Sequence, residues 1–341
     1  MRVGGGTIET GVLGSRPVPS PPAPTSPRLV YVAGAHRSGA TSLGAVMAGN
    51  PGIFFAGELY RIPHPIFEVP DARRLCSCGL AADDCPFWNE VRSRLGSEPG
   101  MLQALHRGQL RFESWRWLLR TAWKRARRDP ELLDHLARVG RFVRVLSEVS
   151  GSPLVLESSY NPVRGWLYRD PATGLDVRFI HLVRDGRNFI ASEQHATDPP
   201  EAHWRWIRST PVVVGRWVAY NVLSILLLRP TGRCLRVRYE DFVRSTGTVL
   251  SQISRFIGVD LSDVARQVES GAAIPMRHVA AGNRMRLEGA VRLEPHFAET
   301  PSLSTGSLVA FWGLAGWLAL SLGYRPASSS VPRAPTAEST T

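Results

Sequence analysis

The clearest chemical pattern in the chain is a glycine-rich loop near its start. Gly34 and Gly39 are separated by four residues, and Thr41 follows. An apolar run at 28–34 precedes the loop and a helix-like sequence follows it, which is the strand–loop–helix context of a phosphate-binding loop. Backbone N–H groups in such a loop, together with the helix N-terminus, attract phosphate. The loop therefore predicts a phosphorylated ligand; a degenerate nucleotide loop or a plain glycine-rich turn is the alternative.

One position in the loop argues against a nucleoside triphosphatase. Ala40 stands where such an enzyme has the lysine that reaches the β- and γ-phosphates. A donor whose single 5′-phosphate carries a sulfuryl group has no γ-phosphate to hold. It needs a cation beside the bridging oxygen where leaving-group charge develops, and Arg37 can supply it.

A second charged pattern follows the apolar run at 177–183. Arg184 comes at the end of this predicted strand, and Ser192 follows eight residues later in a predicted helix. An arginine and a serine at this spacing can converge on one phosphate. Arg187 is a further candidate, although it can equally pair with nearby acids. A solvated charged turn is the alternative for any one of these residues, and two such motifs at strand ends disfavour it.

Both motifs resemble those of the sulfotransferase family. The segment 37–42 is similar to that family's 5′-phosphosulfate loop in its arginine version, and 184–192 is similar to its 3′-phosphate pattern, with Gly186 in place of a proline. The resemblance implies that the donor is 3′-phosphoadenosine 5′-phosphosulfate and that no metal is needed. The donor-binding residues that it implies are Arg37, Ser38, Gly39, Ala40, Thr41, Ser42, Arg184 and Ser192.

The likeness extends to three further segments. The segment 156–164 resembles a bacterial sulfotransferase segment in which a lysine stands at the position of Tyr160, so a cationic role there is lost or moved. Tyr239 begins a Tyr-Glu-Asp segment whose tyrosine contacts the nucleotide in the family. The segment 278–286 is similar to a late loop that closes over the cofactor, which implies that Gly282, Asn283 and Arg286 bind it. The likeness spans residues 28–325, with 90–150 unmatched.

Sulfuryl transfer to an alcohol requires a base near the acceptor oxygen. Glu58 follows a short predicted strand at the same edge of the sheet, and arginine-loop sulfotransferases have a glutamate at this place, so we predict Glu58 as the base. An exposed rim glutamate or a partner for Arg37 is the alternative, and His36 is a competing base. His181 lies within an apolar run and reads as a core histidine. Ser158 and Ser159 are predicted to line the acceptor site.

The predicted fold is an open parallel α/β sheet of the P-loop type. Short apolar runs, each followed by helix-like sequence, indicate four or five buried parallel strands with helices on both faces, whose ligands bind beyond the carboxyl ends of the strands. The runs are 28–34, 53–56, 153–157, 177–183 and 234–239. One sulfotransferase domain is predicted at 28–325, with a helical insertion over the sheet edge at 60–150. The tails 1–27 and 326–341 are predicted to be disordered.

Composition narrows the partners. The net charge is +12, but the only lysine is Lys124 and the other basic residues are arginines, which reflects genome composition more than a nucleic-acid surface. No base-reading motif is recognisable, so nucleic acid is not an expected partner. The N-terminus has no secretory signal pattern, and the apolar stretch 308–322 is shorter than the roughly 20 residues of a spanning helix, which favours a buried helix and a cytoplasmic protein.

Two features outside these motifs leave alternatives open. Cys76, Cys78 and Cys85 could bind zinc only with His64 or the remote Cys234 as the fourth ligand. The string around them resembles one in bacterial sulfotransferases, and the pattern lacks a second paired-ligand cluster, so a structural disulfide or a packed loop is preferred to a metal. The segment 107–128 combines tryptophans with arginines. Such a helix can contact an anionic membrane, grip an anionic acceptor, or form a lid with a solvated basic face.

The predicted function is sulfuryl transfer to a hydroxyl of a carbohydrate, a glycolipid or another small acceptor, with Arg37 and Glu58 catalytic. A kinase or nucleoside triphosphatase of related fold is one alternative. A non-catalytic, membrane-associated interaction protein that retains the fold is another, and the departures at Tyr160 and Gly186 favour it.

Overall fold

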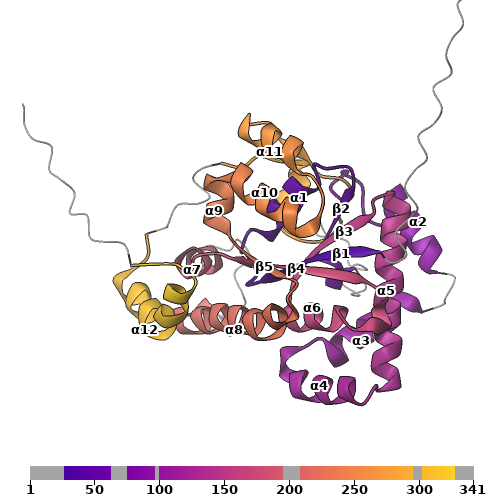
Figure 1. Ribbon diagram of the computed structural model, residues 1–341, viewed down its shortest axis with the longest axis horizontal. Helices are drawn as coiled ribbons and strands as arrows, with labels where there is room; N and C mark the ends of the chain where they lie inside the picture. Colours follow the sequence, from indigo (N-terminus) through magenta and orange to yellow (C-terminus); the bar gives the residue numbers. More distant parts are fainter. Residues whose placement is uncertain (1–26, 63–74, 97–99, 195–207, 295–301, 327–341) are drawn as a thin grey trace, which may run out of the picture.

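The computed structural model describes residues 27–62, 75–96, 100–194, 208–294 and 302–326 (Figure 1). Its centre is a five-stranded parallel sheet in the order β2-β3-β1-β4-β5, with β1 in the middle. The strands are β1 (Arg28–Gly34), β2 (Ile53–Gly57), β3 (Leu154–Tyr160), β4 (Asp176–Val183) and β5 (Cys234–Arg238). The predicted parallel α/β fold is confirmed. Most of the tails and His64 lie outside the described residues.

The strands are buried on both faces, as continuous apolar runs in a parallel sheet require. On one face, Val30, Val32 and Leu156 pack with the helices α1 (Ala40–Met47), α10 (Thr246–Ile257) and α11 (Ser262–Glu269). A short antiparallel pair, β6 (Ile274–Pro275) and β7 (Ala290–Val291), adjoins this layer. The helix α9 (Tyr239–Arg244) continues directly from β5.

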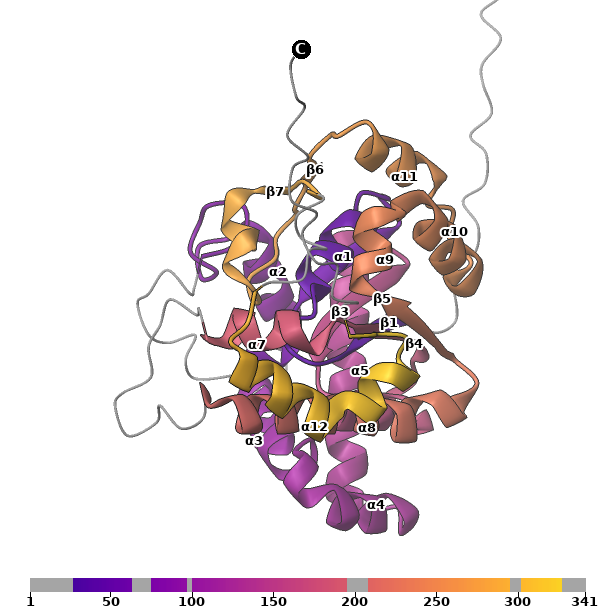
Figure 2. The same ribbon diagram turned by 90° about the vertical axis from the view of Figure 1, so that its left-hand side faces the viewer.

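The opposite face is covered by helices of the segment between β2 and β3, and by helices that follow β3. Tyr31, Val155 and Phe179 pack with residues of α2 (Pro86–Leu95), α3 (Met101–Phe112) and α5 (Pro130–Ser150). The helices α6 (Pro162–Tyr168) and α8 (Thr210–Leu228) also contact this face directly. The helix α7 (Gly186–Gln194) follows β4, and α12 (Thr305–Ser321) lies against α7 and α8 (Figure 2). The short 3-10 helices are η1 (Leu59–Arg61), η4 (Trp115–Trp117), η5 (Pro171–Thr173), η7 (Arg229–Thr231) and η8 (Arg284–Glu288).

The composition of the basic and tryptophan-rich segment 107–128 predicted one helix, but the structure divides it into several. The helix α3 ends at Phe112, η4 follows, and α4 (Leu118–Ala126) is a separate helix. Ser114 marks the break because its side chain accepts the backbone N–H of Arg116, and such a local bond competes with helix continuation. Five large apolar side chains of this segment remain exposed, at Leu110, Trp115, Trp117, Leu119 and Trp123.

A buried group of charged residues joins this helical segment to the sheet. The Arg164 guanidinium donates to Glu157 on β3 at 2.9 Å and to the carboxylate of Glu113, which also contacts His135 of α5 at 2.9 Å. Burial raises the pKa of Glu113, but the charge of Arg164 and the His135 contact outweigh it and leave that pKa below its usual range. Buried charges need such partners, so the group fixes how α3 and α5 sit on β3.

The C-terminal helix α12 is buried on one side only. Phe311, Ala315 and Leu318 pack against α7 and α8, whereas Val309 and Trp317 are exposed. The prediction of a buried helix at 308–322 is therefore wrong for its outer side. Among the described residues, one helical stretch, Thr210–Thr231, is long and apolar enough to cross a membrane, which is weak evidence because core helices share this composition.

Candidate active site

The phosphate loop connects β1, at the centre of the sheet, to α1. Gly34 has a φ of 144°, and a Cβ there would lie 2.3 Å from the carbonyl oxygen of Leu182 on the neighbouring strand. Gly39 has a φ of 91°, and its Cα faces the ring of Tyr239 so closely that a Cβ would lie 2.0 Å from a ring carbon. Both positions therefore require glycine. Ala40 then begins α1, which places the loop at a helix N-terminus, where anions are favoured.

Arg37 and Arg184, predicted to serve two different phosphates, lie beside each other. Arg184 Nη1 donates to the backbone carbonyl of Arg37 at 3.1 Å, and Arg37 Nη1 lies 3.4 Å from Ser192 Oγ. The Arg184 guanidinium also stacks on the Tyr239 ring, 4.8 Å from its centroid. The loop between β1 and α1 and the loop between β4 and α7 thus form one basic region at the carboxyl edge of the sheet.

The other predicted residues of the phosphate loop surround this region. Ser38 and Ser42 are buried, and Thr41 is half-buried in the first turn of α1. Burial raises the pKa of Tyr239 above its ordinary value, so the phenol stays protonated, and the Ser42 hydroxyl lies within hydrogen-bond reach of it. Ser42 Oγ also faces Met285 Sδ at 3.5 Å, which joins the loop to the 278–286 segment.

Glu193 is a site residue that the sequence analysis missed. Its carboxylate pairs with Arg37 Nε at 2.6 Å, with His36 Nε2 at 3.2 Å and with the Arg216 guanidinium. Burial raises the pKa of Glu193, but the His36 hydrogen bond and the His36 and Arg216 charges outweigh it and lower that pKa to about 2. The only feature of the sequence that could have indicated a role for Glu193 was its place directly after Ser192. His36, the competing base in the sequence prediction, thus has Glu193 as its ion-pair partner.

Arg187 pairs with Asp185 instead of pointing at the basic region. Three contacts of 2.6–3.1 Å join its guanidinium to that carboxylate, as the alternative in the sequence analysis anticipated. The backbone N–H of Asp185 donates to Glu240 Oε1 at 2.9 Å, and the Tyr324 hydroxyl donates to Glu240 Oε2 at 2.9 Å. These bonds fix the turn that presents Arg184.

Glu58 lies between the phosphate loop and the 278–286 segment. It follows β2, its backbone N–H donates to the carbonyl of Ala281 at 3.1 Å, and its side chain is 14% exposed. A Cβ on Gly282 would be 3.9 Å from Glu58 Oε1 and 3.9 Å from Thr41 Oγ1, so these three residues share one small region. Glu58 Oε2 accepts from Arg61 Nε at 2.6 Å, and Arg61, not Arg37, is its ion-pair partner.

The predicted late-loop residues differ in their surroundings. Asn283 Oδ1 accepts the backbone N–H of Met285 and so caps η8. Arg286 is buried, and its guanidinium donates to the carbonyls of Gly282 at 2.9 Å and of Leu75 at 3.3 Å. These contacts shape the loop, while Gly282 presents its backbone toward Glu58.

A group of aromatic side chains adjoins Glu58. The hydroxyls of Tyr60 and Tyr160 are 2.9 Å apart, and the ring of Tyr160 lies 5.8 Å from those of His36 and Tyr220. Burial is the main cause that raises the pKa of Tyr160 well above its ordinary value, and the charges of Tyr60 and Glu58 raise it further. This phenol therefore remains neutral. All four side chains are half-buried. Tyr160 thus provides a neutral hydroxyl at the position where the similar bacterial segment has a lysine.

Three predictions about other residues are settled by burial. His181 Nε2 contacts Asn221 Oδ1 at 2.9 Å, and burial lowers its pKa to about 4, which confirms a neutral core histidine. Ser158 and Ser159 are buried, and Ser159 hydrogen-bonds with Glu157 and with the backbone N–H of Tyr60. The prediction that these serines line an open acceptor site is therefore wrong.

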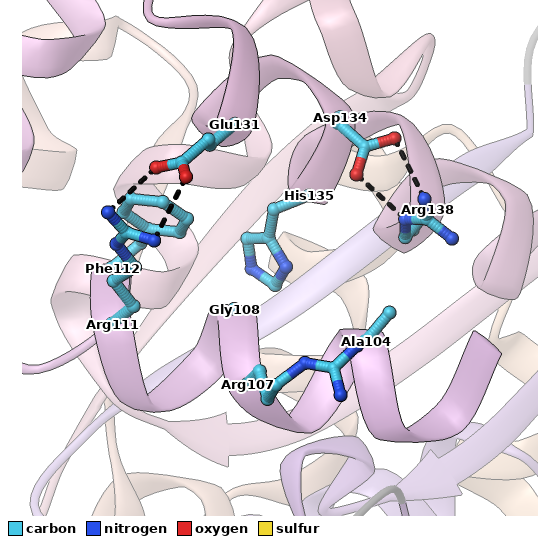
Figure 3. Close-up of a pocket in the computed structure, with 9 residues that line it drawn as sticks. All are labelled: Ala104, Arg107, Gly108, Arg111, Phe112, Glu131, Asp134, His135 and Arg138. Atoms are coloured by element: carbon cyan, nitrogen blue, oxygen red, sulfur yellow. Dashed lines mark hydrogen bonds and ion pairs between the residues drawn. The ribbon is translucent and has the colours of Figure 1, made fainter. Parts of the chain in front are cut away.

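A separate pocket lies between α3 and α5 (Figure 3). Its volume is about 270 Å³, and its walls include Arg107, Gly108 and His135. Two of its ion pairs, Arg111 with Glu131 and Asp134 with Arg138, are internal to the walls. None of the predicted donor-binding residues lines it.

Comparisons with known proteins bear on this arrangement. Residues 176–263, which include Arg184, Ser192 and Tyr239, match the model of a sulfotransferase family. These residues are sulfotransferase-family sequence, and the match supports the family that the motifs predicted. No curated protein sequence matches the chain at a significant level.

Solved structures similar to this chain include three sulfotransferases. The sulfotransferase domain of the Synechococcus PCC 7002 olefin synthase is 19% identical, covering 87% of this chain and 97% of that one, with a TM-score of 0.48. A sulfotransferase domain from the curacin biosynthetic pathway is 17% identical, covering 88% and 98%, with a TM-score of 0.47. The sulfotransferase STF9 of Mycobacterium avium is 13% identical, covering 89% and 78%, with a TM-score of 0.44.

Proposed function

We propose that the chain is a sulfotransferase whose donor is 3′-phosphoadenosine 5′-phosphosulfate. The observation that carries the proposal is the contact of two strand-end loops, in which Arg184 Nη1 donates to the Arg37 carbonyl and Arg37 Nη1 lies 3.4 Å from Ser192 Oγ. One adenosine nucleotide with phosphates at both its 3′ and 5′ positions could contact both loops. The 5′-phosphosulfate would be held by Arg37 and the residues at 38–42, and the 3′-phosphate by Arg184 and Ser192.

The proposed reaction is a direct sulfuryl transfer. The acceptor oxygen attacks sulfur, the bond from sulfur to the bridging oxygen breaks, and its electron pair stays on the 5′-phosphate of the leaving nucleotide. The acceptor proton passes to the Glu58 carboxylate, which lies beside Thr41 and Gly282. Arg37 stabilises the negative charge that develops on the bridging oxygen. Glu193 holds the Arg37 guanidinium in place through Nε.

The acceptor region in this proposal is the aromatic group next to Glu58. Tyr60, Tyr160 and Tyr220 offer apolar ring faces together with hydroxyls that stay protonated. Such surfaces suit a ligand that has both carbon faces and hydroxyl groups, since the rings pack and the phenols hydrogen-bond. We therefore infer a carbohydrate, glycolipid or similar small hydroxyl compound as acceptor.

Calorimetry with 3′-phosphoadenosine 5′-phosphate tests the donor assignment directly. Binding should be at least tenfold tighter than that of adenosine 5′-phosphate or ATP, because only the bisphosphate engages both loops. Labelled donor incubated with cell extract then identifies acceptors. Absence of nucleotide binding would favour a non-catalytic interaction protein, and turnover of ATP would favour a nucleotide kinase or triphosphatase.

We also propose that η4 and α4 contact an anionic membrane surface. Trp115, Trp117 and Trp123 expose 62%, 48% and 54% of their surface, next to the exposed Arg116 and Arg120. Tryptophan suits the boundary between lipid and water, and arginine is attracted to anionic headgroups. In flotation with phosphatidylglycerol vesicles, the protein should be recovered in the vesicle fraction, and less of the variant Trp115→Ser/Trp123→Ser should be recovered there. Equal recovery with neutral phosphatidylcholine vesicles would contradict the charge component.

A further inference from the structure

Three cysteines and one histidine that are far apart in the sequence meet at one point. Cys76, Cys78 and Cys85 lie between β2 and α2, and His278 lies just after β6. One ligand atom from each residue lies within 4.8 Å of every other. The described residues include all four cysteines of the chain, and each of them is a free thiol. The clustering therefore needs an explanation other than a disulfide.

Two of the separations are close to the edges of a metal tetrahedron. Cys78 Sγ and Cys85 Sγ are 3.7 Å apart, and Cys85 Sγ is 3.3 Å from His278 Nδ1. With Zn–S distances of about 2.3 Å and a Zn–N distance of about 2.0 Å, tetrahedral geometry gives S–S edges of about 3.8 Å and S–N edges of about 3.5 Å. A disulfide would require about 2.05 Å between the sulfur atoms.

The surroundings hold the ligands in this arrangement. Cys76 and Cys85 are buried, and Cys85 is the N-cap residue of α2. The His278 ring stacks on Phe87, with 5.1 Å between centroids and 8° between planes. The Trp88 indole N–H donates to the His278 carbonyl at 2.8 Å. His278 itself has a φ of 50°, an uncommon backbone conformation for a residue other than glycine.

We propose that Cys76, Cys78, Cys85 and His278 bind one structural Zn²⁺ ion. Four protein ligands complete a tetrahedron, so the ion would have no open position for a substrate. The sequence pattern disfavoured a metal because it lacks a second paired-ligand cluster, with His64 or Cys234 as the only candidates for a fourth ligand. The structure supplies His278 instead, from a segment 193 residues beyond Cys85.

The site connects the 278–286 segment, which is predicted to close over the donor and is called the donor loop below, to the segment before α2. Ser77 N donates to the carbonyl of Val279 at 3.0 Å, Val279 N donates to Ser77 Oγ at 2.9 Å, and Arg286 Nε donates to the Leu75 carbonyl. Ala281 in the same loop accepts from the backbone N–H of Glu58. The ion would therefore fix the loop that carries Gly282 and Asn283, a consequence that rests on the proposed function.

Metal analysis of the purified full-length protein tests the site without any nucleotide. We expect one zinc per chain by elemental mass spectrometry, and cobalt substitution should produce the visible absorption of tetrahedral thiolate coordination. The variant Cys78→Ser removes an exposed ligand with little risk to folding, and it should lower zinc affinity at least tenfold in chelator competition. Cys234→Ser removes a cysteine outside the cluster and should retain stoichiometric zinc.

Three results would overturn the proposal. The first is a folded protein that contains no zinc although zinc was present during purification. The second is a disulfide among these cysteines in non-reducing mass spectrometry. The third is equal zinc affinity in Cys78→Ser and Cys234→Ser. A further measurement addresses the donor loop: removal of zinc should weaken binding of 3′-phosphoadenosine 5′-phosphate several-fold. If the native protein binds zinc but no nucleotide, the metal site stands and the proposed function fails.

Discussion

The carboxyl edge of the sheet and the helical segment between β2 and β3 use charged residues in different ways. At the edge, Arg37 and Arg184 come from short loops next to central strands and lie together, with Glu193 as partner of Arg37. Where the helical segment meets the sheet, Glu113 at the end of α3 and Arg164 of α6 are buried and pair with each other. The first arrangement can accept an anionic ligand, whereas the second can only hold elements together.

Local sequence predicts the first arrangement and not the second. Residues of the edge follow strands at fixed offsets, so a motif of nine residues or fewer describes each loop. Glu113 and Arg164 are separated by 51 residues, and Glu113 and His135 by 22, with no pattern that links them. The following changes separate the two arrangements, from the largest expected effect to the smallest.

The substitution Glu58→Gln should remove turnover and spare donor binding. An amide cannot accept the acceptor proton, and loss of a general base lowers rates by about 10²–10⁴-fold. Single-turnover sulfuryl transfer measures the rate, and calorimetry with 3′-phosphoadenosine 5′-phosphate measures binding. Full activity in this variant would show that another group takes the proton.

The substitution Arg164→Met should lower the unfolding free energy of the protein by destabilising the helical segment. It should leave the carboxyl edge of the sheet, with Arg37 and Arg184, intact. Removing the cation leaves Glu113 and Glu157 as buried carboxylates without their main partner, which costs about 3–5 kcal/mol of unfolding free energy. Urea denaturation measures this loss. Nucleotide affinity at low denaturant should stay within twofold of the parent; a large fall in affinity would mean that the two regions are not separate.

The substitution Arg184→Ala should weaken binding of 3′-phosphoadenosine 5′-phosphate by roughly 10- to 100-fold, as expected for loss of a charge-assisted contact. Binding of adenosine 5′-phosphate should change much less, since it lacks the 3′-phosphate. Arg116→Ala is the matched control, because Arg116 is an exposed arginine of η4. Equal losses for both nucleotides would place Arg184 elsewhere than at the 3′-phosphate.

The substitution Glu193→Gln should make the protein less sensitive to acid. The folded-state pKa of Glu193 is lowered to about 2, so its stabilisation is present above its ordinary value near 4.5 and is lost as pH falls from there to 2. The variant should show an acid-induced loss of unfolding free energy that is roughly 1–2 kcal/mol smaller between pH 5 and 3. Chemical denaturation across that range provides the measurement, and parallel curves for the two proteins would contradict it.

The sequence predicted the sheet well because a parallel strand buried on both faces is a continuous apolar run. The run at 28–34 coincides with β1, and that at 177–183 differs from β4 by one residue. The break after Phe112 was not predicted, since it depends on one side-chain bond of Ser114. The exposed side of α12 was missed for a similar reason: its sequence is apolar all round, so only packing decides which side is covered.

Within the candidate site, residues that follow strands were predicted and residues that arrive from elsewhere were not. Arg37, Arg184 and Glu58 follow β1, β4 and β2. Glu193 owes its role to Arg37 and Arg216, and His278 owes its place beside Cys85 to a contact between distant segments. Neither contact has a local signature, because each depends on how separate loops meet in space.

The hydrogen bond from Arg184 to the Arg37 carbonyl has a consequence for ligand discrimination. Since one side chain reaches from the second loop to the backbone of the first, ordering either loop should help to order the other. We therefore expect positive coupling, in which a nucleotide occupying both loops gains more affinity than its halves measured separately. Common adenosine nucleotides that fill only one loop would gain no such benefit, so they would compete poorly even at high cellular concentration.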